Sequence, residues 1–149
     1  MLAIQTNGGF LIAKIKQIQD RVFSRILTQN GIAQLNGPQG RILHTLWNGD
    51  GLSITELAET TGLTNTTLTG MLDRLETAGF LRRVYDESDR RKVRIRLTDT
   101  AVSMRTAYLN VSEQMNAVFY KGFSSEDIQS FERTLARILV NLTKEEQRL

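Results

Sequence analysis

The side chains with the clearest chemical potential in this chain are cations clustered between residues 81 and 96. This segment holds seven Arg or Lys residues against three Asp or Glu residues, a local charge of +4. The whole chain has 19 Lys or Arg and 16 Asp or Glu, so the remaining residues have 12 against 13 and a charge of −1. Clustered cations displace counterions from a polyanion such as DNA, so the segment indicates binding to phosphates.

Residues that serve catalysis are scarce by comparison. The chain has no Cys and a single His, His44, and it has no glycine-rich phosphate loop. A thiol nucleophile, a thiol redox sensor and a zinc site with Cys ligands are therefore excluded. We predict that the protein is not an enzyme and holds no metal or cofactor, although acid–base chemistry by carboxylates alone stays open.

The N-terminal segment predicts neither a membrane span nor a signal peptide. Residues 1–13 carry no charged side chain, but Gln5, Thr6, Asn7 and two glycines interrupt the apolar residues. The segment is too short and too polar to cross a bilayer, and it lacks a basic start and a clear cleavage site. We expect a cytoplasmic protein with no membrane partner.

Two short helices in the middle of the chain are the elements that would position the cations. Ser53 and Thr64 are typical N-cap residues, and Gly62 and Gly79 follow the two apolar-periodic segments as left-handed C-terminal residues. A preceding helix is expected to start with Asn36 as its N-cap. Two short helices joined by a tight turn containing Gly predict a helix-turn-helix.

After Gly79 the apolar period changes from that of a helix to that of a strand. Residues 80–85 and 92–97 read as strands, and in the second one apolar residues alternate strictly with cations. The charged connector between them is too long for a tight turn, so the pair predicts a hairpin with an extended tip. The combination is a winged helix-turn-helix spanning residues 36–97.

Long amphipathic helices are predicted on both sides of this region. Residues 9–30 carry a wide apolar stripe, and 99–148 contain one helix running from the cap Thr98 to about residue 121 and another capped by Ser124. The fold class is therefore mainly α, a winged helix-turn-helix with a two- to three-stranded β-wing, in one chain unit of residues 1–149. Two-fold pairing through 9–30 and 99–148 would bury the stripes, whereas packing within one chain is the alternative.

Base recognition in such a fold belongs to the exposed face near the start of the second helix, residues 64–78, in the DNA major groove. Removing the apolar positions leaves Asn65, Thr66, Thr69, Gly70 and Arg74. The hydroxyls of Ser53 and Thr64, at helix N-termini, are candidates to bind phosphates. The alternative is that the threonines form an ordinary polar surface.

The run from Leu57 through the segment LTGMLDRLE (68–76) to GFLRR (79–83), followed by Asp89, Arg91 and RLT (96–98), resembles the multiple antibiotic resistance regulator (MarR) family. The resemblance implies a homodimer that binds a pseudo-palindromic operator in double-stranded DNA and usually represses transcription. It also implies that Arg91 enters the minor groove and that Asp89 positions it through a salt bridge. The candidate wing and backbone contacts are Asp89, Arg90, Arg91, Lys92, Arg94 and Arg83. Arg74 and Arg83 match family positions that are associated either with DNA or with support of the wing.

Members of this family often bind a small aromatic or lipophilic effector that lowers their affinity for DNA. By resemblance, His44 and Trp47 are candidates to line such a site. A second class of function remains open at this point, in which the winged helix contacts protein or RNA and binds no operator. The sequence names neither an operator nor an effector.

Overall fold

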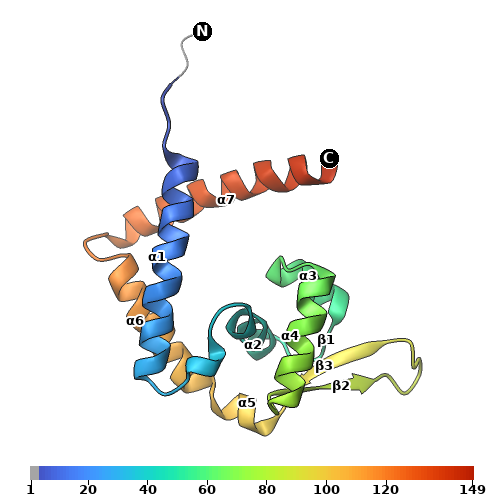
Figure 1. The fold of residues 1–149 in the computed structure, drawn as a ribbon. Helices are drawn as coiled ribbons and strands as arrows, with labels where there is room; N and C mark the ends of the chain where they lie inside the picture. The colour runs from blue at the N-terminus through green and yellow to red at the C-terminus, as the bar shows by residue number, and fades with distance from the viewer. Residues whose placement is uncertain (1–3) are drawn as a thin grey trace. The chain divides into compact units, whose positions relative to one another are not determined.

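The computed structural model describes residues 4–149; the first three residues of the segment considered above for a signal peptide lie outside it. The chain forms two compact units, one that ends at Glu113 and another that covers Gln114–Leu149. The elements in chain order are α1 (Gly8–Gln29), η1 (Ala33–Leu35), α2 (Pro38–Asn48), β1 (Leu52–Ser53), α3 (Ile54–Thr61), α4 (Asn65–Thr77), β2 (Leu81–Tyr85), β3 (Val93–Leu97), α5 (Asp99–Ser103), α6 (Arg105–Phe119) and α7 (Ser125–Arg148) (Figure 1).

Helices predominate, and the sheet that the described residues form has three antiparallel strands in the order β1-β3-β2. This architecture confirms the predicted mainly α fold with a small β-wing. Within residues 4–149, no helix combines the length and the apolar character that a bilayer span requires.

The predicted helix caps form where the sequence places them. The side chains of Ser53, Thr64 and Thr98 each accept a hydrogen bond from a backbone N–H in the first turn of the helix that follows. At the start of α7 a complete capping box forms. The Ser124 hydroxyl accepts from the Asp127 backbone N–H, and the Asp127 carboxylate accepts from the Ser124 backbone N–H. Local side-chain chemistry therefore sets these boundaries.

The predicted cap of the second helix is wrong. The N-cap of α2 is Gly37, whose φ of 62° is left-handed, and Asn36 lies outside the helix in an extended conformation. Asn36 instead donates to the Ser24 hydroxyl of α1 at 3.1 Å, and its Oδ1 accepts from the Gly37 N–H. The tertiary contact with α1 thus moves the start of α2 by one residue.

The single long helix predicted from Thr98 is also wrong, because Met104 interrupts it between α5 and α6. In a continuous helix the Ala101 carbonyl would accept from the N–H four residues later. It accepts instead from the Met104 N–H at 3.2 Å and from the Trp47 indole Nε1 at 2.9 Å. The indole therefore competes for a carbonyl of the helix and marks the break.

Apolar side chains from most elements of the first unit form one core. Those with less than 2% exposure include Leu27, Leu35, Ile42, Leu43, Leu46, Leu57, Leu68, Leu72, Leu75, Leu81 and Ile95. Truncating one such leucine to Ala costs roughly 2–5 kcal/mol. The core joins α2, α3, α4 and the sheet into one support for the hairpin.

The hairpin is fastened to α4 by Arg83 of β2. Its Nη1 donates to Glu76 Oε1 at 2.6 Å and its Nη2 to Asp73 Oδ1 at 2.8 Å, while its backbone N–H donates to Glu76 Oε2 at 2.9 Å. The hydrogen bonds from the Arg83 backbone and side chain lower the pKa of Glu76, with burial acting weakly in the opposite direction. One strand is thereby held against one helix through both backbone and side chain.

The Glu76→Gln variant tests this fastening through its pH dependence. A carboxyl with a lowered pKa stabilises the fold above its ordinary pKa of 4.5, and this contribution disappears as the pH falls through the folded-state pKa. Because Glu76 is 39% exposed, solvent screening limits the effect to less than about 1 kcal/mol. In urea titrations, we expect wild type to be more stable than the variant at pH 7 and the difference to shrink below pH 4.5.

Glu59→Gln on α3 is the matched control, because Glu59 is exposed and forms no salt bridge in the described chain. We expect it to leave stability unchanged at both pH values. A difference between wild type and Glu76→Gln that stays constant from pH 7 to pH 3 would show that the carboxylate charge is not what stabilises the contact.

Candidate nucleic-acid interface

The exposed face of α4 presents the polar residues predicted for base recognition. Asn65, Thr66 and Thr69 are exposed, whereas Leu68 and Leu72 on the opposite side are fully buried. At 100° per residue the three polar side chains fall within about a third of the helix circumference. They therefore form one surface at the N-terminal end of α4.

Gly70 and Arg74 flank this surface. Gly70 has no heavy atom within 4 Å of the position that a Cβ would occupy, so its lack of a side chain serves no contact within the described chain. Arg74 is exposed farther round the helix, where it lines a shallow hollow with Asp73, Thr77 and Ala78. The structure thus brings four of the five candidates together and places Arg74 at their edge.

The tip of the hairpin is an ordered turn organised by two carboxylates. Asp89 Oδ1 accepts from the Arg91 Nε at 3.1 Å and from the Arg91 N–H at 3.0 Å. Asp86 accepts from both the hydroxyl and the N–H of Ser88, and these bonds lower the pKa of Asp86. The backbone of Asp86 donates to the Lys92 carbonyl at 3.0 Å and closes the turn.

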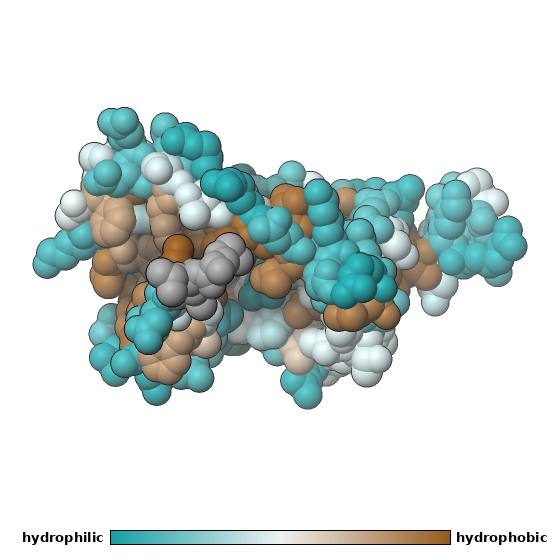
Figure 2. Space-filling model, turned by 90° about the horizontal axis from the view of Figure 1, so that it is seen from above, coloured by the Kyte–Doolittle hydropathy of each residue, from teal (hydrophilic) through white to brown (hydrophobic). Residues whose placement is uncertain are grey.

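This turn presents a cation to solvent. The Arg91 side chain is 91% exposed, while that of Asp89, which holds it, is only 28% exposed. The projecting end of the hairpin is mostly hydrophilic (Figure 2). An exposed guanidinium with a fixed direction is suited to a narrow anionic groove.

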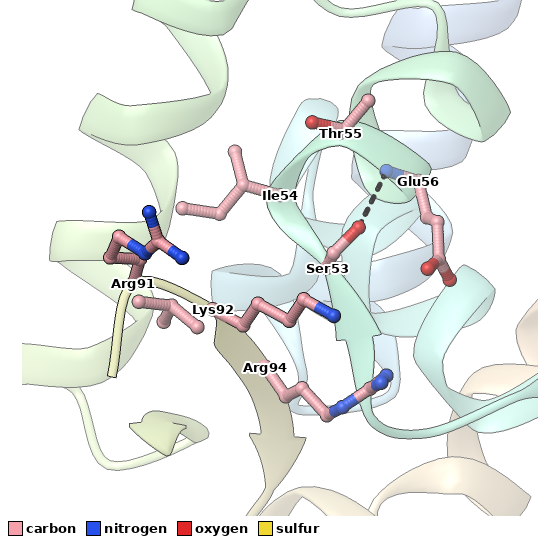
Figure 3. Close-up of a pocket in the computed structure, with 8 residues that line it drawn as sticks. Ser53, Ile54, Thr55, Glu56, Arg91, Lys92 and Arg94 are labelled. Atoms are coloured by element: carbon pink, nitrogen blue, oxygen red, sulfur yellow. Dashed lines mark hydrogen bonds between the residues drawn. The ribbon is translucent and has the colours of Figure 1, made fainter. Parts of the chain in front are cut away.

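A cavity of about 420 Å³ lies between the start of α3 and the hairpin (Figure 3). Its lining includes Ser53 and Glu56 from the first unit's β1–α3 segment and Arg91, Lys92 and Arg94 from the hairpin. The Ser53 hydroxyl accepts from the Glu56 N–H at 3.1 Å, so it acts as a cap. The Arg94 Nη1 donates to the Gly51 carbonyl at 3.0 Å. Three cations therefore share one hollow with a helix N-terminus, which suits a phosphate.

Arg83 supports the wing, which is one of the two roles that the resemblance implies for it. Its side chain is only 21% exposed, and its guanidinium binds Asp73 and Glu76. We assign it a positioning role. Sequence reasoning missed these two carboxylates, although their spacing of three residues on a predicted helix could have indicated a shared partner.

Asp50 is a second positioning residue that the sequence did not reveal. Its Oδ1 accepts from the Gly51 N–H at 2.9 Å and from the Leu97 N–H at 3.0 Å, and it joins the turn after α2 to the end of β3. Nothing in the turn sequence distinguishes this role from that of an ordinary turn residue.

The two predicted effector residues both pack against Tyr108, and the His44 ring lies 6.0 Å from that of Tyr108. His44 is exposed and lines a hollow of about 470 Å³ with Arg41, Asn48 and Thr60 among others. Trp47 is half-buried, and its ring packs 5.2 Å from that of Tyr108. Among the described residues, no group of three or more His, Cys, Asp or Glu residues could hold a metal ion.

The winged region is similar in sequence to known proteins. Residues 35–93 match the family model described as MarR family. The regulator PecS of Dickeya dadantii is 28% identical over 85% of this chain and 76% of its own length. The uncharacterised regulator YfiV of Bacillus subtilis is 34% identical over 54% of this chain, and TtmR of Methylorubrum extorquens is 44% identical over 44%. The matches span only 55% of YfiV and 34% of TtmR.

Solved structures share the whole fold. The regulator SlyA has a TM-score of 0.82 at 22% identity, with 94% of this chain and 96% of SlyA covered. A mutant of Escherichia coli MarR in complex with operator DNA has a TM-score of 0.79 at 22% identity, with 92% of this chain and 99% of that protein covered. The winged region of the chain, residues 35–93, thus matches the MarR family in sequence, and the solved structures share its fold.

Proposed function

We propose that this protein is a homodimeric transcriptional regulator that binds a specific pseudo-palindromic operator in double-stranded DNA and represses transcription. The observation that carries the proposal is the arrangement of two surfaces in one rigid unit. The exposed face of α4 and the Arg91-bearing hairpin tip are joined by the ion pairs of Arg83. A helix in the major groove and a wing tip in a neighbouring minor groove require such a fixed relation.

The chemistry of each surface suits its groove. Asn65 can form a two-bond contact with adenine, and Thr66 and Thr69 can hydrogen-bond base edges or contact a thymine methyl. Arg91 at the tip suits the stronger negative potential of a narrow minor groove. Arg90, Lys92 and Arg94, with the capped starts of α3 and α4, supply phosphate contacts that set the register on the duplex.

Self-association is supported by apolar side chains that the single chain leaves exposed. On α1 they are Phe10, Leu11, Ile12, Ile15 and Ile18, with exposures between 43% and 69%. On α7 they are Ile138, Leu139, Val140 and Leu142, between 38% and 65%. Exposed apolar surface of this kind marks an interface, and a two-fold dimer would present α4 to two half-sites about one DNA turn apart.

An effector that releases DNA is part of the proposal. The structure of Bordetella bronchiseptica BpsR concerns regulation of DNA binding by 6-hydroxynicotinic acid, and Streptomyces coelicolor PcaV was solved with its natural ligand. The hollow beside His44 is a candidate site for a small aromatic ligand in this chain, with Arg41 as a cation on its wall. Trp47 would act indirectly, through its packing against Tyr108.

We also propose that the protein has no catalytic activity and works in the cytoplasm, where operator DNA is accessible. The single His and the absence of Cys support the first point. The relatives are regulators of transcription, which supports both.

Arg91→Ala tests the wing contact. We expect the variant to bind a duplex selected by the wild-type protein about ten- to a hundredfold more weakly, as for the loss of a specific arginine contact. Asp89→Asn should cause a smaller loss of DNA affinity, because Arg91 is still present but its ion pair with residue 89 is removed. Fluorescence anisotropy titrations at fixed salt measure both, and Arg105→Ala on α6 is the exposed-arginine control. If Arg91→Ala binds the duplex as tightly as wild type, the hairpin tip is not part of the DNA interface. If the wild-type protein binds RNA but no DNA duplex, the result favours a winged helix that contacts RNA.

Thr66→Ala tests base recognition by α4. Removing one base contact should relax the preference at one position of each half-site by about 1–3 kcal/mol and leave the salt dependence of binding unchanged. Binding to a panel of singly substituted duplexes measures the preference, and Thr100→Ala on the exposed surface of α5 is the control. If the base preferences of Thr66→Ala equal those of wild type, α4 does not read bases through this residue.

Leu142→Glu tests the dimer. Sedimentation of wild type should give twice the chain mass of 16.9 kDa, whereas a buried glutamate at an apolar interface should shift the species towards the monomer. Ser130→Glu introduces the same charge at an exposed position on the polar side of α7, and it should leave the dimer intact. A monomeric wild type at micromolar concentration would contradict the proposed architecture.

A further inference from the structure

The outer face of the sheet, which is turned away from α4, carries three arginines, of which Arg82 and Arg96 have no place among the DNA contacts proposed above. The strand register places Arg82 of β2 directly opposite Arg96 of β3, and Arg94 lies two residues before Arg96 on the same face. The inner face, in contrast, holds Arg83 opposite Ile95. All three outer arginines are exposed.

These arginines have no carboxylate partners. No salt bridge in the described chain involves Arg82, Arg94 or Arg96. Like charges directly opposite each other on neighbouring strands destabilise a sheet. The arrangement therefore costs folding free energy that nothing within the described chain offsets by ion pairing.

Two of the arginines are nevertheless held in place against the turn that follows α2. The Arg94 Nη1 donates to the Gly51 carbonyl at 3.0 Å. The Arg96 guanidinium lies so close to Gly51 that a Cβ there would be 2.7 Å from Nη1, and Gly51 also has a φ of 80°. Both side chains are thus partly ordered before any ligand binds, which reduces the entropy lost on binding.

The row of cations continues from the proposed DNA contact. Lys92 immediately precedes β3 and alternates with Arg94 and Arg96 of that strand, so the three lie on one face and lead from the hairpin tip towards the base of the sheet. Successive members are about 6.6 Å apart along the strand. The charge and the continuity with the proposed DNA contact favour a DNA backbone over an acidic protein.

We propose that Arg82 and Arg96, which continue from the phosphate contact of Arg94, bind the phosphate backbone of duplex DNA that flanks the operator, beyond the groove that the hairpin tip enters. The inference rests on the proposed function, because it assumes that α4 and the tip dock on DNA. Each guanidinium can donate two parallel hydrogen bonds to a phosphate. The contact adds affinity and length to the bound site without reading its sequence.

The experiment compares two duplexes and two double variants. A site selected from random-sequence DNA by the wild-type protein is trimmed to the shortest duplex that still binds, and it is then extended by about one helical turn of unrelated sequence at each end. The test variant is Arg82→Gln with Arg96→Gln, which spares the Arg94 bond to Gly51. The control is Arg25→Gln with Arg105→Gln, which removes two exposed arginines from α1 and α6.

We expect wild type and control to bind the extended duplex at least about tenfold more tightly than the short one, and the test variant to bind both duplexes equally. Salt dependence is measured as the slope of the logarithm of the binding constant against the logarithm of the salt concentration. On the extended duplex, the magnitude of this slope should be smaller by about 3 to 4 per dimer for the test variant, because each lost phosphate contact contributes about 0.9. Its melting temperature should equal or exceed that of wild type, because an opposed pair of like charges is removed.

Two results would overturn the inference while leaving the proposed function intact: no gain by wild type from the added DNA, or the same gain in the test variant. Failure of wild type to select any duplex would instead reject the proposed function itself. Nuclease protection provides an independent readout, because the protected region should be shorter at both ends for the test variant alone.

Discussion

The interaction on which the rest of this structure depends is the network of Arg83 with Asp73 and Glu76. A two-stranded hairpin is marginal by itself and needs a neighbour to fix its direction. Arg83 supplies that neighbour by joining the middle of β2 to the last two turns of α4. Because the Arg83 N–H also donates to Glu76, the carboxylate fixes the strand's backbone as well as its charged side chain. The relative position of the α4 surface and the hairpin tip follows from this contact.

Charge in the hairpin is organised by strand alternation. The inner face has one arginine, and α4 neutralises it with two carboxylates. The outer face has three arginines that form no salt bridge within residues 4–149. At the tip, Asp89 orients Arg91 while leaving most of the guanidinium in solvent. The same residue type thus serves within this hairpin as a structural tie, as an oriented cation at the tip and as an exposed cation without a salt bridge in the described residues.

Features that depend on neighbouring residues could be predicted. Ser53, Thr64, Thr98 and Ser124 cap the helices that follow them, because each bond spans only three residues. The alternation along β3 likewise separates a buried Ile95 from exposed arginines. The exposed polar face of α4 was predicted for the same reason, since helical spacing alone decides which side chains share a side.

Contacts between distant parts of the chain account for the errors. The break at Met104 involves a carbonyl that Trp47 reaches from 54 residues away, and the start of α2 shifts because Asn36 binds Ser24 on another helix. No local pattern encodes these partners.

Arg82 and Arg83 show most directly what each level determined. The sequence by itself determined that both are cations in a strand of alternating exposure, within a basic hairpin that follows a helix-turn-helix. Only the tertiary structure decided that Arg83 is an internal tie and that Arg82 is left without a salt bridge in the described chain. The physical reason is that α4 packs on one face of the sheet, so its two carboxylates reach one of two adjacent arginines and not the other.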